Sequence, residues 1–440
     1  MKIFTFKGGI HPPYEKDISI SEPLREVPRP KISVVLLSQH IGAANKSIVN
    51  KGDIVEEGQR IGESDSFVSS PVHAPFAGKI LDIKKAIHPA VGPGMSVFIE
   101  TDPEKQKKQY EEKVPSKLTP QEIIEKVKSA GIVGMGGAAF PTHVKLSVPE
   151  EKKIKTLIIN GAECEPYLTC DQSLMTRKTR EILKGLELFM EVLHPEEIVI
   201  AIEDNKKAAL FAFEKELKKI SAESATKIRI IMLETKYPQG GEKQLIKAVS
   251  GKEVPPGGLP LDIGFLVQNI GTLYAVYEAV YKGKPLIERI VTISGDCLRR
   301  PGNYKIRVGT TVKDIIENAG IELYKDPKKI LFGGPMMGFA QAQIEVPVLK
   351  STAGILFLSE DKASVFEETP CIKCAKCVDV CPVRLIPTDI MKNVKKKKWE
   401  NVESLHVSDC MECGACNYSC PARIPLVHYI KEGKAAIAKR

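Results

Sequence analysis

Eight of the eleven cysteines lie in the last 70 residues, in two runs with the same spacing. Within each run three cysteines are separated by two residues, and a fourth follows after three more residues and precedes a proline. Three thiolates with this spacing can bind one [4Fe–4S] cluster, and the fourth cysteine normally binds the cluster of the other run. The pattern therefore predicts two clusters, the first held by Cys371, Cys374, Cys377 and Cys420 and the second by Cys410, Cys413, Cys416 and Cys381.

Zinc sites and disulfide bonds are the two other common uses of closely spaced cysteines. Structural zinc typically takes four ligands from two separated Cys-x₂-Cys pairs, and it does not require a repeated triple with a trailing Cys-Pro. Disulfides are typical of exported proteins, and the amino-terminal run MKIFTFKGGIHPP lacks the apolar core of a signal peptide. The sequence therefore favours clusters, and with them the transfer of single electrons.

The composition is that of an ordinary globular protein. Hydrophobic residues make up 43% and charged residues 27% of 440 residues, and a chain of this length is expected to form about three domains. It contains no run of about 18 apolar residues, so we expect an intracellular protein without a membrane span. Nucleic-acid binding is disfavoured because the basic residues do not alternate with aromatic ones.

Positive charge is concentrated in the cysteine-rich tail. The net charge of the whole chain is +9, and residues 371–440 contain 13 Lys or Arg against seven Asp or Glu. The densest run is Lys395–Lys398. It could be a solvated helix face or a docking patch for an acidic partner or an anionic membrane surface, and the sequence leaves both open.

Short apolar and polar runs cut by Gly and Pro predict β structure over residues 30–100. Two stretches in it, Val49–Ile61 and Ser70–Leu81, resemble the halves of a lipoyl- or biotinyl-type sandwich. Those carrier domains hold a modified lysine at a hairpin tip, and the corresponding stretch Glu63–Phe67 contains no lysine. We therefore expect a structural module rather than a carrier.

The middle of the chain predicts a layered α/β domain. Thr119 to Glu122 has the form of a capping box, which begins a helix that runs to about Ala130. Apolar strand-like runs then alternate with helical segments, a pattern typical of a mainly parallel sheet. The expected strands are Thr156–Ile159, Ile198–Ile202 and Ile228–Met232, and the expected helices are Arg180–Val192, Lys206–Ser221 and Gln244–Val249.

The last third of the chain predicts two smaller units. Arg289–Ser294, Arg300–Tyr304 and Thr311–Ala319 give the pattern strand, turn, strand and helix, which resembles the soluble-ligand-binding β-grasp domain. A strand-like run, Gly354–Leu358, precedes the cysteines, and the stretch Pro387–Val402 is predicted to be helical. We therefore expect a helical ferredoxin domain at the end.

A glycine-rich loop is the second chemical signal. The run GMGGAAFPTHVK places Gly134, Gly136 and Gly137 where a backbone can approach a ligand closely and its amides can bind phosphate. Taken alone, the loop is a weak indication, because it follows a helix whereas a dinucleotide fingerprint follows a strand. A tight turn that packs on a neighbouring element is the alternative.

Three further polar motifs stand downstream, the first of them directly after a predicted strand. They contain Asn160, Glu163 and Glu165 in the first, Tyr237, Gly240 and Glu242 in the second, and Asn269 and Thr272 in the third. Loops at the carboxyl ends of strands are where α/β sheets bind ligands. Polar groups there could hold a flavin ring and its phosphate by hydrogen bonds.

In order and spacing these motifs resemble the flavin- and NADH-binding subunit of respiratory complex I. Together with Phe6–Pro13 and the two cysteine runs, they resemble more closely the RnfC family, whose members belong to the Rnf ion-translocating electron-transport complex, over essentially the whole chain. The resemblance implies that non-covalent FMN takes two electrons from NADH and passes them singly to the two clusters. It also implies partner subunits, one with iron–sulfur clusters and others in the membrane, with this chain peripheral on the cytoplasmic side of the cell membrane, and coupling to Na⁺ or H⁺ translocation.

The resemblance implies a multidomain fold that combines α/β and α+β units. It consists of a lipoyl-like barrel-sandwich domain (1–110), a Rossmann-like α/β domain that binds FMN and NADH (115–285), a β-grasp domain (286–350) and a helical two-cluster ferredoxin domain (351–440).

It also implies cofactor contacts. Gly134, Gly136 and Gly137 correspond to the loop that cradles the flavin, Lys145 to a basic residue near the phosphate, and Phe140 could stack on adenine. Asn160, Glu163 and Glu165 correspond to the segment at the flavin ring, Tyr237, Gly240 and Glu242 to the loop near flavin and nicotinamide, and Asn269 and Thr272 to the phosphate side. Hydride transfer needs no side chain as acid or base, so no catalytic residue is expected.

Three positions depart from the complex I pattern. Met135 replaces an arginine, Ala162 an aspartate and Gly241 the first of two glutamates. Two rival functions remain: a cobalamin reductase of the same superfamily, and an electron-relay or docking subunit without flavin. The other cysteines, Cys164, Cys170 and Cys297, are expected to be buried thiols that bind no metal.

Overall fold

A five-stranded parallel sheet forms the core of the α/β unit in the computed structural model, which describes residues 2–115, 117–219, 227–364 and 366–440. Its strands run parallel throughout. In spatial order they are β1 (Ile3–Phe4), β12 (Ile228–Leu233), β11 (Glu197–Glu203), β10 (Thr156–Gly161) and β13 (Phe265–Asn269). The predicted parallel sheet is confirmed, whereas β1 and β13 were not predicted.

Helices cover both faces of this sheet, as the apolar strands require. One face packs against residues from α2 (Pro120–Ser129), α5 (Thr179–Leu193), α6 (Lys207–Leu217) and α9 (Ile270–Lys282), and the other against α8 (Glu242–Ser250). The short α3 (Thr142–Leu146), α4 (Cys170–Arg177) and η1 (Pro260–Ile263) complete the unit. The helices expected within 180–192 and 244–249 are confirmed. The one expected at 206–221 is confirmed as far as Leu217, and its last two residues lie outside the described ranges.

The capping box at the start of α2 is present. The Thr119 hydroxyl accepts a hydrogen bond from the Glu122 amide (3.3 Å), and the Glu122 carboxylate accepts one from the Thr119 amide (2.7 Å). The helix ends at Ser129, and Gly131 follows with φ +67°. The loop that begins at Gly134 therefore leaves from the end of this helix.

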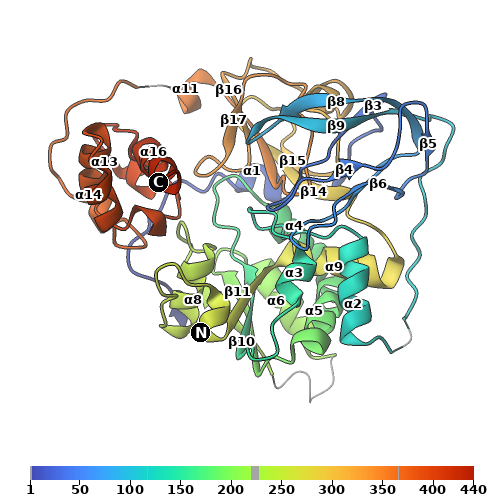
Figure 1. Ribbon diagram of the computed structural model, residues 1–440, viewed down its shortest axis with the longest axis horizontal. Helices are drawn as coiled ribbons and strands as arrows, with labels where there is room; N and C mark the ends of the chain where they lie inside the picture. The colour runs from blue at the N-terminus through green and yellow to red at the C-terminus, as the bar shows by residue number, and fades with distance from the viewer. Residues whose placement is uncertain (1, 116, 220–226, 365) are drawn as a thin grey trace.

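The barrel-sandwich unit contains two small antiparallel sheets. One has the order β3 (Ile32–Leu36), β9 (Gly92–Thr101), β8 (Gly78–His88) and β5 (Ile54–Val55), and the other β4 (Lys46–Ser47), β6 (Arg60–Glu63) and β7 (Val72–His73). Both sheets contribute to one apolar core that includes Val35, Ile61, Val72 and Ile99. The strands β3, β8 and β9 lie above the α/β unit in Figure 1.

The β-grasp unit has a six-stranded mixed sheet. Its order is β17 (Phe339–Gln341), β16 (Lys329–Phe332), β18 (Gly354–Leu358), β14 (Glu288–Ser294), β15 (Gly302–Arg307) and β2 (Arg25–Glu26). The helix α10 (Val312–Asn318) packs into its core, and α1 (Asp17–Ile20) contacts β14 and β15. The short α11 (Glu360–Ala363) follows β18.

The tail is a helical unit that lies to one side of the others, in red in Figure 1. Its elements are α12 (Lys376–Asp379), α13 (Pro387–Lys395), α14 (Trp399–Ser404), η2 (Val407–Asp409), α15 (Ala415–Ser419) and α16 (Leu426–Ala438).

The helix expected over 387–402 is wrong in one respect, because it breaks at Lys396–Lys398. Both Val394 and Val402 come within 3.0 Å of a Cβ built on Gly433 of α16. A straight helix would separate these two valines by about 12 Å along its axis. Lys396–Lys398 are thus an exposed turn rather than a helix face, and Lys395, the last residue of α13, pairs with Glu368 at 2.8 Å.

Residues 3–26 lie outside the sandwich sheets and contact the other units. β1 pairs with β12, Ile10 pairs with Tyr237, and β2 pairs with β15. β18 likewise pairs with β14 and β16 rather than with the tail. The four-domain division stays a proposal, and these pairings argue for ending the β-grasp domain after Ala363 and for treating residues 2–30 as a segment shared among units.

A buried lysine lies where three units meet. The Lys350 ammonium donates hydrogen bonds to the carbonyl oxygens of Pro71 (2.6 Å) in the sandwich and Gly131 (2.7 Å) after α2. The Lys350 amide donates to Gln39 Oε1 at 3.0 Å. Burial lowers the pKa of Lys350 to about 7. A charge on Lys350 therefore destabilises the folded protein at this junction, whereas the hydrogen bonds of Lys350 stabilise it.

The stability of the wild type should rise between pH 7 and 9, and replacing Lys350 with Met should remove that rise. Between pH 7 and 9 the unfolded chain holds the lysine proton, since the ordinary pKa is 10.5, whereas the folded protein has released it. The free energy of unfolding of the wild type should therefore rise, relative to the variant, by about 1 kcal/mol per pH unit. Burial and the Lys350 charge lower the pKa of His40 to about 4 and of His73 to about 3, so both stay neutral throughout. Thermal unfolding of both proteins at pH 7 and 9 measures the difference, and equal shifts would contradict it.

Candidate functional site

The predicted flavin motifs meet at the carboxyl edge of the parallel sheet. The Met135 amide donates to Thr272 Oγ1 (2.9 Å), so the glycine-rich loop lies against the start of α9. A Cβ built on Gly136 would lie 3.3 Å from Asn269, the residue that caps α9. Asn269 in turn donates to Asp171 Oδ2 (2.7 Å) in α4. These contacts join two of the predicted motifs.

The other two motifs are joined by hydrogen bonds at the ends of β10 and β12. Asn160 Nδ2 donates to the Gly240 carbonyl (2.8 Å), and the Gly240 amide donates to Cys164 Sγ (3.2 Å). Lys145 Nζ lies 2.8 Å from Glu242 Oε1, and both side chains are partly exposed. The structure therefore brings all four motifs, and Lys145 with them, to one edge.

The glycine-rich loop leaves an open cradle there. Gly136 and Gly137 are exposed, and Gly137 has φ +135° with no atom within 4 Å of a Cβ built on it. Gly134 closes the loop through its amide, which donates to the carbonyl of the half-buried Phe140 at 2.8 Å. A ligand with a phosphate and a flat ring fits a bare backbone of this kind, so the residues fit an FMN group.

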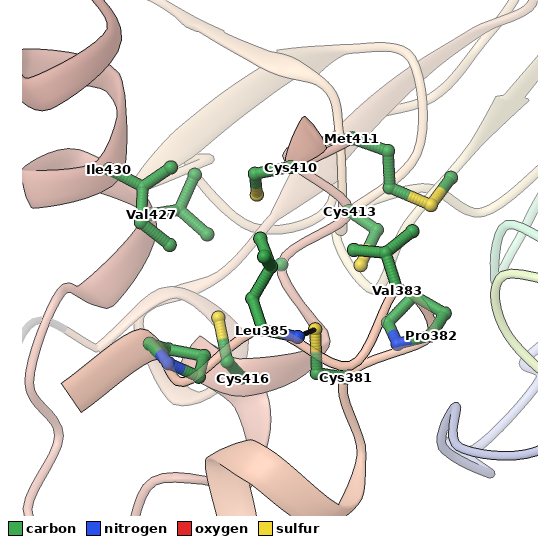
Figure 2. Close-up of a pocket in the computed structure, with 12 residues that line it drawn as sticks. Cys381, Pro382, Val383, Leu385, Cys410, Met411, Cys413, Cys416, Val427 and Ile430 are labelled. Atoms are coloured by element: carbon green, nitrogen blue, oxygen red, sulfur yellow. Dashed lines mark hydrogen bonds between the residues drawn. The ribbon is translucent and has the colours of Figure 1, made fainter. Parts of the chain in front are cut away.

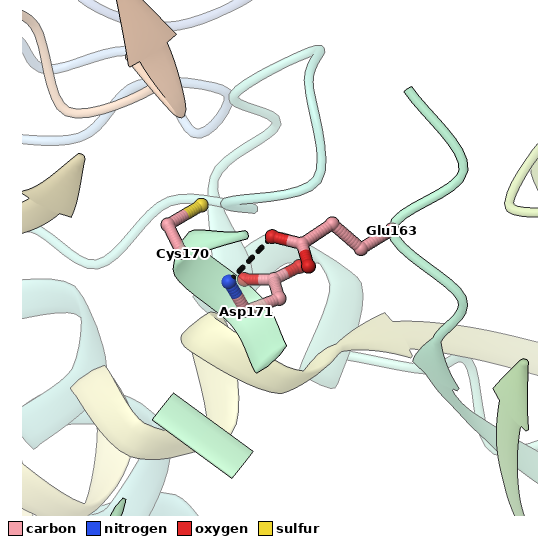
Figure 3. Close-up of side chains that lie close together, drawn as sticks. All are labelled: Glu163, Cys170 and Asp171. Carbon is pink, nitrogen blue, oxygen red and sulfur yellow. Dashed lines mark hydrogen bonds between the residues drawn. The ribbon is translucent and has the colours of Figure 1, made fainter. Parts of the chain in front are cut away.

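Glu163 has protein partners. Its two carboxylate oxygens accept hydrogen bonds from the amides of Asp171 (2.6 Å) and Gln172 (3.2 Å) at the start of α4. Figure 3 shows the Glu163 carboxylate directed toward Asp171, with Cys170 beside them. The Cys170 sulfur and one carboxylate oxygen each of Glu163 and Asp171 lie within 4.8 Å of one another. Burial raises the pKa of Glu163 to about 7, and the Lys16 charge opposes that rise. Glu163 thus fixes α4 against the loop after β10.

Glu165 also has protein partners. It accepts hydrogen bonds from the amides of Met336 (3.1 Å) and Met337 (2.9 Å) of the β-grasp unit, and burial raises its pKa to about 7. The buried Tyr237 donates from its hydroxyl to the carbonyl of Cys413 (2.6 Å) in the tail. Glu165 and Tyr237 therefore join the flavin loops to other units, and their predicted contact with the cofactor stays a prediction.

The second predicted cluster corresponds to one cavity. Its lining includes Cys381, Cys410, Cys413 and Cys416, together with Leu385 and Ile430. Figure 2 shows the four thiols around this space, although Cys381 comes from the first run and the others from the second. The Leu385 amide donates to Cys381 Sγ and the Glu412 amide to Cys410 Sγ, both at 3.3 Å. Four thiols with amide donors beside them fit a [4Fe–4S] cluster.

Three of the four thiols of the first predicted cluster lie together. Cys371, Cys377 and Cys420 pack in one apolar group with Cys416 and Ala422. Burial raises the pKa of Cys377, and the charges of Cys420 and Cys371 raise it further. Cys374 is exposed in the loop before α12. The other cysteines are Cys170 and Cys297, buried as expected, and Cys164, which is only partly buried.

The flavin loops, which carry the four predicted motifs, are in direct contact with the cavity of the second predicted cluster. A Cβ built on Gly241 would lie 2.7 Å from Cε of Met411, the residue that follows Cys410. A side chain at position 241 would therefore require the end of the Met411 side chain to move. Ile10, Tyr237, Cys413 and Ala415 form one buried cluster at this contact.

Sequence reasoning missed several residues of the site. The buried Lys16 donates to the carbonyls of Glu163 (2.7 Å), Glu165 (2.9 Å) and Leu168 (2.5 Å), and so fixes the loop after β10. Burial lowers the pKa of Lys16. Its position 147 residues before Glu163 gives no local signal, whereas Asp171 closes the motif NGAECEPYLTCD and could have been found there.

Four domain families match successive parts of the chain. They are the RnfC barrel sandwich hybrid domain over residues 4–104, the Nuo51 FMN-binding domain over 127–278, the SLBB domain over 290–340 and the 4Fe-4S dicluster domain over 370–424. The predicted fold class and cofactors, FMN and the [4Fe–4S] clusters, are thereby confirmed.

Curated relatives match nearly the whole chain, and each is one subunit of a larger complex. The relative from the proton-translocating ferredoxin:NAD(+) oxidoreductase complex of Clostridium ljungdahlii is 41% identical over 97% of this chain and 93% of the relative. The relative from the Na(+)-translocating complex of Acetobacterium woodii is 42% identical over 98% of this chain and 97% of the relative. The relative from an ion-translocating oxidoreductase complex of Haemophilus influenzae is 41% identical, and the chain spans 65% of its length.

A solved structure shows the same fold over much of the chain. An NAD⁺-reducing [NiFe]-hydrogenase chain in the H2-reduced state has a TM-score of 0.52 and 20% identity, over 72% of this chain and 62% of that one. Within the described residues every helix is too short or too polar to cross a bilayer. From the identity of its relatives and the order of its domains, this chain belongs to the RnfC family, whose members are subunits of ion-translocating ferredoxin:NAD(+) oxidoreductase complexes.

Proposed function

We propose that this chain oxidises NADH at an FMN held by the loops at the carboxyl edge of its parallel sheet. The electrons then pass singly through two [4Fe–4S] clusters to other subunits of an ion-translocating ferredoxin:NAD(+) oxidoreductase complex. The observation that carries the proposal is the direct contact between the flavin loops and the cavity of the second predicted cluster. The Tyr237 hydroxyl donates to Cys413, and Met411 lies against Gly241. This contact gives a short route from a two-electron carrier to a one-electron carrier.

The cofactors supply the redox chemistry, since a flavin can take two electrons from a nicotinamide and release them one at a time. The chain supplies position. Gly136 and Gly137 offer backbone amides to the FMN phosphate, and Lys145 offers a positive charge that Glu242 holds in place. Asn160 and Gly240 set the spacing between the two loops at the flavin ring.

The ligand sets follow the two groups of thiols. Cys381, Cys410, Cys413 and Cys416 would hold the second cluster, next to the flavin loops. Cys371, Cys374, Cys377 and Cys420 would hold the first, and three of these thiols pack in one group with Cys416. The exposure of Cys374 makes the first cluster the exit toward a partner subunit.

The names of the relatives' complexes support a place for this chain in an assembly of several subunits. Those complexes move protons in one relative and Na⁺ in another, and both are assemblies of several subunits. We propose that this chain sits on the cytoplasmic side of the cell membrane, bound to an iron–sulfur subunit and to integral membrane subunits. The relatives' names favour this role over a cobalamin reductase.

The test uses the full chain, reconstituted anaerobically with iron, sulfide and FMN. NADH should bleach the flavin absorbance, and electron paramagnetic resonance should then detect reduced clusters. A protein that retains FMN and is not bleached by NADH would overturn the proposal. An FMN content near zero under conditions that preserve the clusters would favour the flavin-free relay.

A further inference from the structure

The amino-terminal run Phe6–Ile10 lies between the flavin loops and the second cluster cavity. The Gly9 amide donates to the carbonyl of Val380 (2.8 Å), next to the cluster cysteine Cys381. The following residue, Ile10, exchanges two backbone hydrogen bonds with Tyr237, at 2.8 and 2.9 Å. In Figure 1 this part of the chain, in dark blue, passes between the tail unit and the α/β unit. One short segment therefore holds both units through its backbone.

Both glycines of this run have conformations and neighbours that exclude a side chain. Gly8 has φ +90°, and a Cβ there would lie 2.9 Å from the Cys381 carbonyl oxygen. Gly9 has φ +82°, and a Cβ there would lie 2.7 Å from the Tyr237 carbonyl oxygen. Real Cβ atoms do not approach backbone atoms this closely, so a substitution must push one of the two loops away.

The run is anchored at each end. The Phe6 carbonyl accepts a hydrogen bond from Lys236 Nζ (2.7 Å), and the side chain of Ile10 is buried with Tyr237, Cys413 and Ala415. Farther on, Lys16 holds the loop of Glu163 and Glu165. The amino-terminal segment thus contacts the loops on the flavin side and on the cluster side.

We propose that Phe6–Ile10, here called the brace, sets the distance between the flavin loop Tyr237–Gly241 and the second cluster. Gly8 and Gly9 are then positioning residues for electron passage between the two, and this inference rests on the proposed function. Each passage oxidises the flavin by one electron and reduces the cluster by one electron, and no bond of the protein forms or breaks. Two passages return the flavin to its oxidised form, with its protons released to water.

The brace makes a prediction that separates two steps. Gly8 contacts Cys381 and Val380 on the cluster side of the brace, so a substitution there should leave reduction of the flavin by NADH unchanged. Electron passage to the cluster should depend on this contact, because the rate of electron transfer between two carriers falls exponentially with the distance between them.

The test compares Gly8→Ala with Gly92→Ala in the full reconstituted chain. The three atoms nearest to a Cβ on Gly8 belong to Val380 and Cys381, on the cluster side. Gly92 has nearly the same backbone angle (φ +84°), and a Cβ there has no atom within 4 Å, so it is a control for backbone strain alone. In rapid mixing with NADH, both variants should bleach the flavin at the wild-type rate. Gly8→Ala alone should reduce the clusters several-fold more slowly. Cluster reduction at the wild-type rate in Gly8→Ala would overturn the brace.

A second readout does not depend on turnover. Hydrogen exchange should be faster at the Gly9 amide, which donates to Val380, in Gly8→Ala than in Gly92→Ala, and unchanged exchange there would also count against the brace. If Gly8→Ala does not fold, Ile10→Ala replaces it, because this variant keeps the backbone bonds and removes only packing against Tyr237 and Cys413. It should give the same split between the two rates, and equal slowing of both rates would overturn the inference.

Failure of the proposed function is distinguishable from failure of the brace. If NADH does not bleach the wild-type flavin, the proposed function fails, and light-driven reduction of the flavin by a sacrificial amine donor can start the reaction instead. The comparison of Gly8→Ala with Gly92→Ala then tests the brace as before.

Discussion

Replacing Cys381 with Ala should remove the second cluster and leave the first intact, although Cys381 belongs to the first cysteine run. The reason is spatial, because Cys381 lines the cavity of Cys410, Cys413 and Cys416. The iron content should fall from about eight to about four atoms per chain. Iron and acid-labile sulfide analysis, with electron paramagnetic resonance of the reduced protein, measures the loss. Since the lost cluster is the one next to the flavin loops, NADH should no longer reduce the remaining one at the wild-type rate.

The reciprocal variant makes the assignment sharp. Cys420→Ala should remove the first cluster, since Cys420 packs with Cys371 and Cys377, and should leave the second able to accept electrons. Cys297→Ala is the matched control, because this thiol is buried in the β-grasp core away from both groups. Its iron content should stay at the wild-type value. If Cys381→Ala and Cys420→Ala lost the same resonance signal, the crossed ligand sets would be wrong.

Replacing Gly137 with Ala should weaken FMN binding by at least about tenfold, which corresponds to about 1.4 kcal/mol. The backbone angle of φ +135° is one that only glycine adopts easily, and strain of this kind costs about 1–3 kcal/mol. The new methyl group would also point into the open cradle where the phosphate and ring are expected. Titration of the flavin-free protein with FMN, followed by flavin fluorescence, gives the affinity.

Gly251→Ala serves as the control for that experiment. Gly251 ends α8 with φ +74°, and a Cβ there has no atom within 4 Å. Both variants should lose a similar amount of thermal stability without FMN, but only Gly137→Ala should lose affinity for it. If both variants lost the same affinity for FMN, backbone strain rather than the open cradle would determine that affinity.

Local sequence pattern predicted most of the α/β unit. β10 and β11 are buried on both faces, and strands of this kind are short continuous apolar runs that stand out between helices. The pattern could not place β1, which is two residues long and pairs with a strand 229 residues later. It predicted β18 as a strand but not that β18 pairs with β14 and β16, because the residues of one strand do not determine which strands it pairs with.

The same limit applies to the site. Cysteine spacing predicted which thiols share a cavity, because the ligands of a cluster follow a fixed local rule. The carboxylates Glu163 and Glu165 follow no such rule, and each binds two backbone amides that only the folded chain brings near. The turn at Lys396–Lys398 likewise depends on packing against Gly433, which a helical pattern does not contain.

The pairing of β1 with β12 also bears on how the protein is made. Ile3 and Phe4 leave the ribosome 229 residues before Met232 and Leu233, so the sheet cannot close while they emerge. At bacterial and eukaryotic translation speeds this delay is on the order of ten seconds or more. During synthesis Ile3 and Phe4 must therefore wait, exposed or chaperoned, until the residues that separate them from their partner strand have been translated.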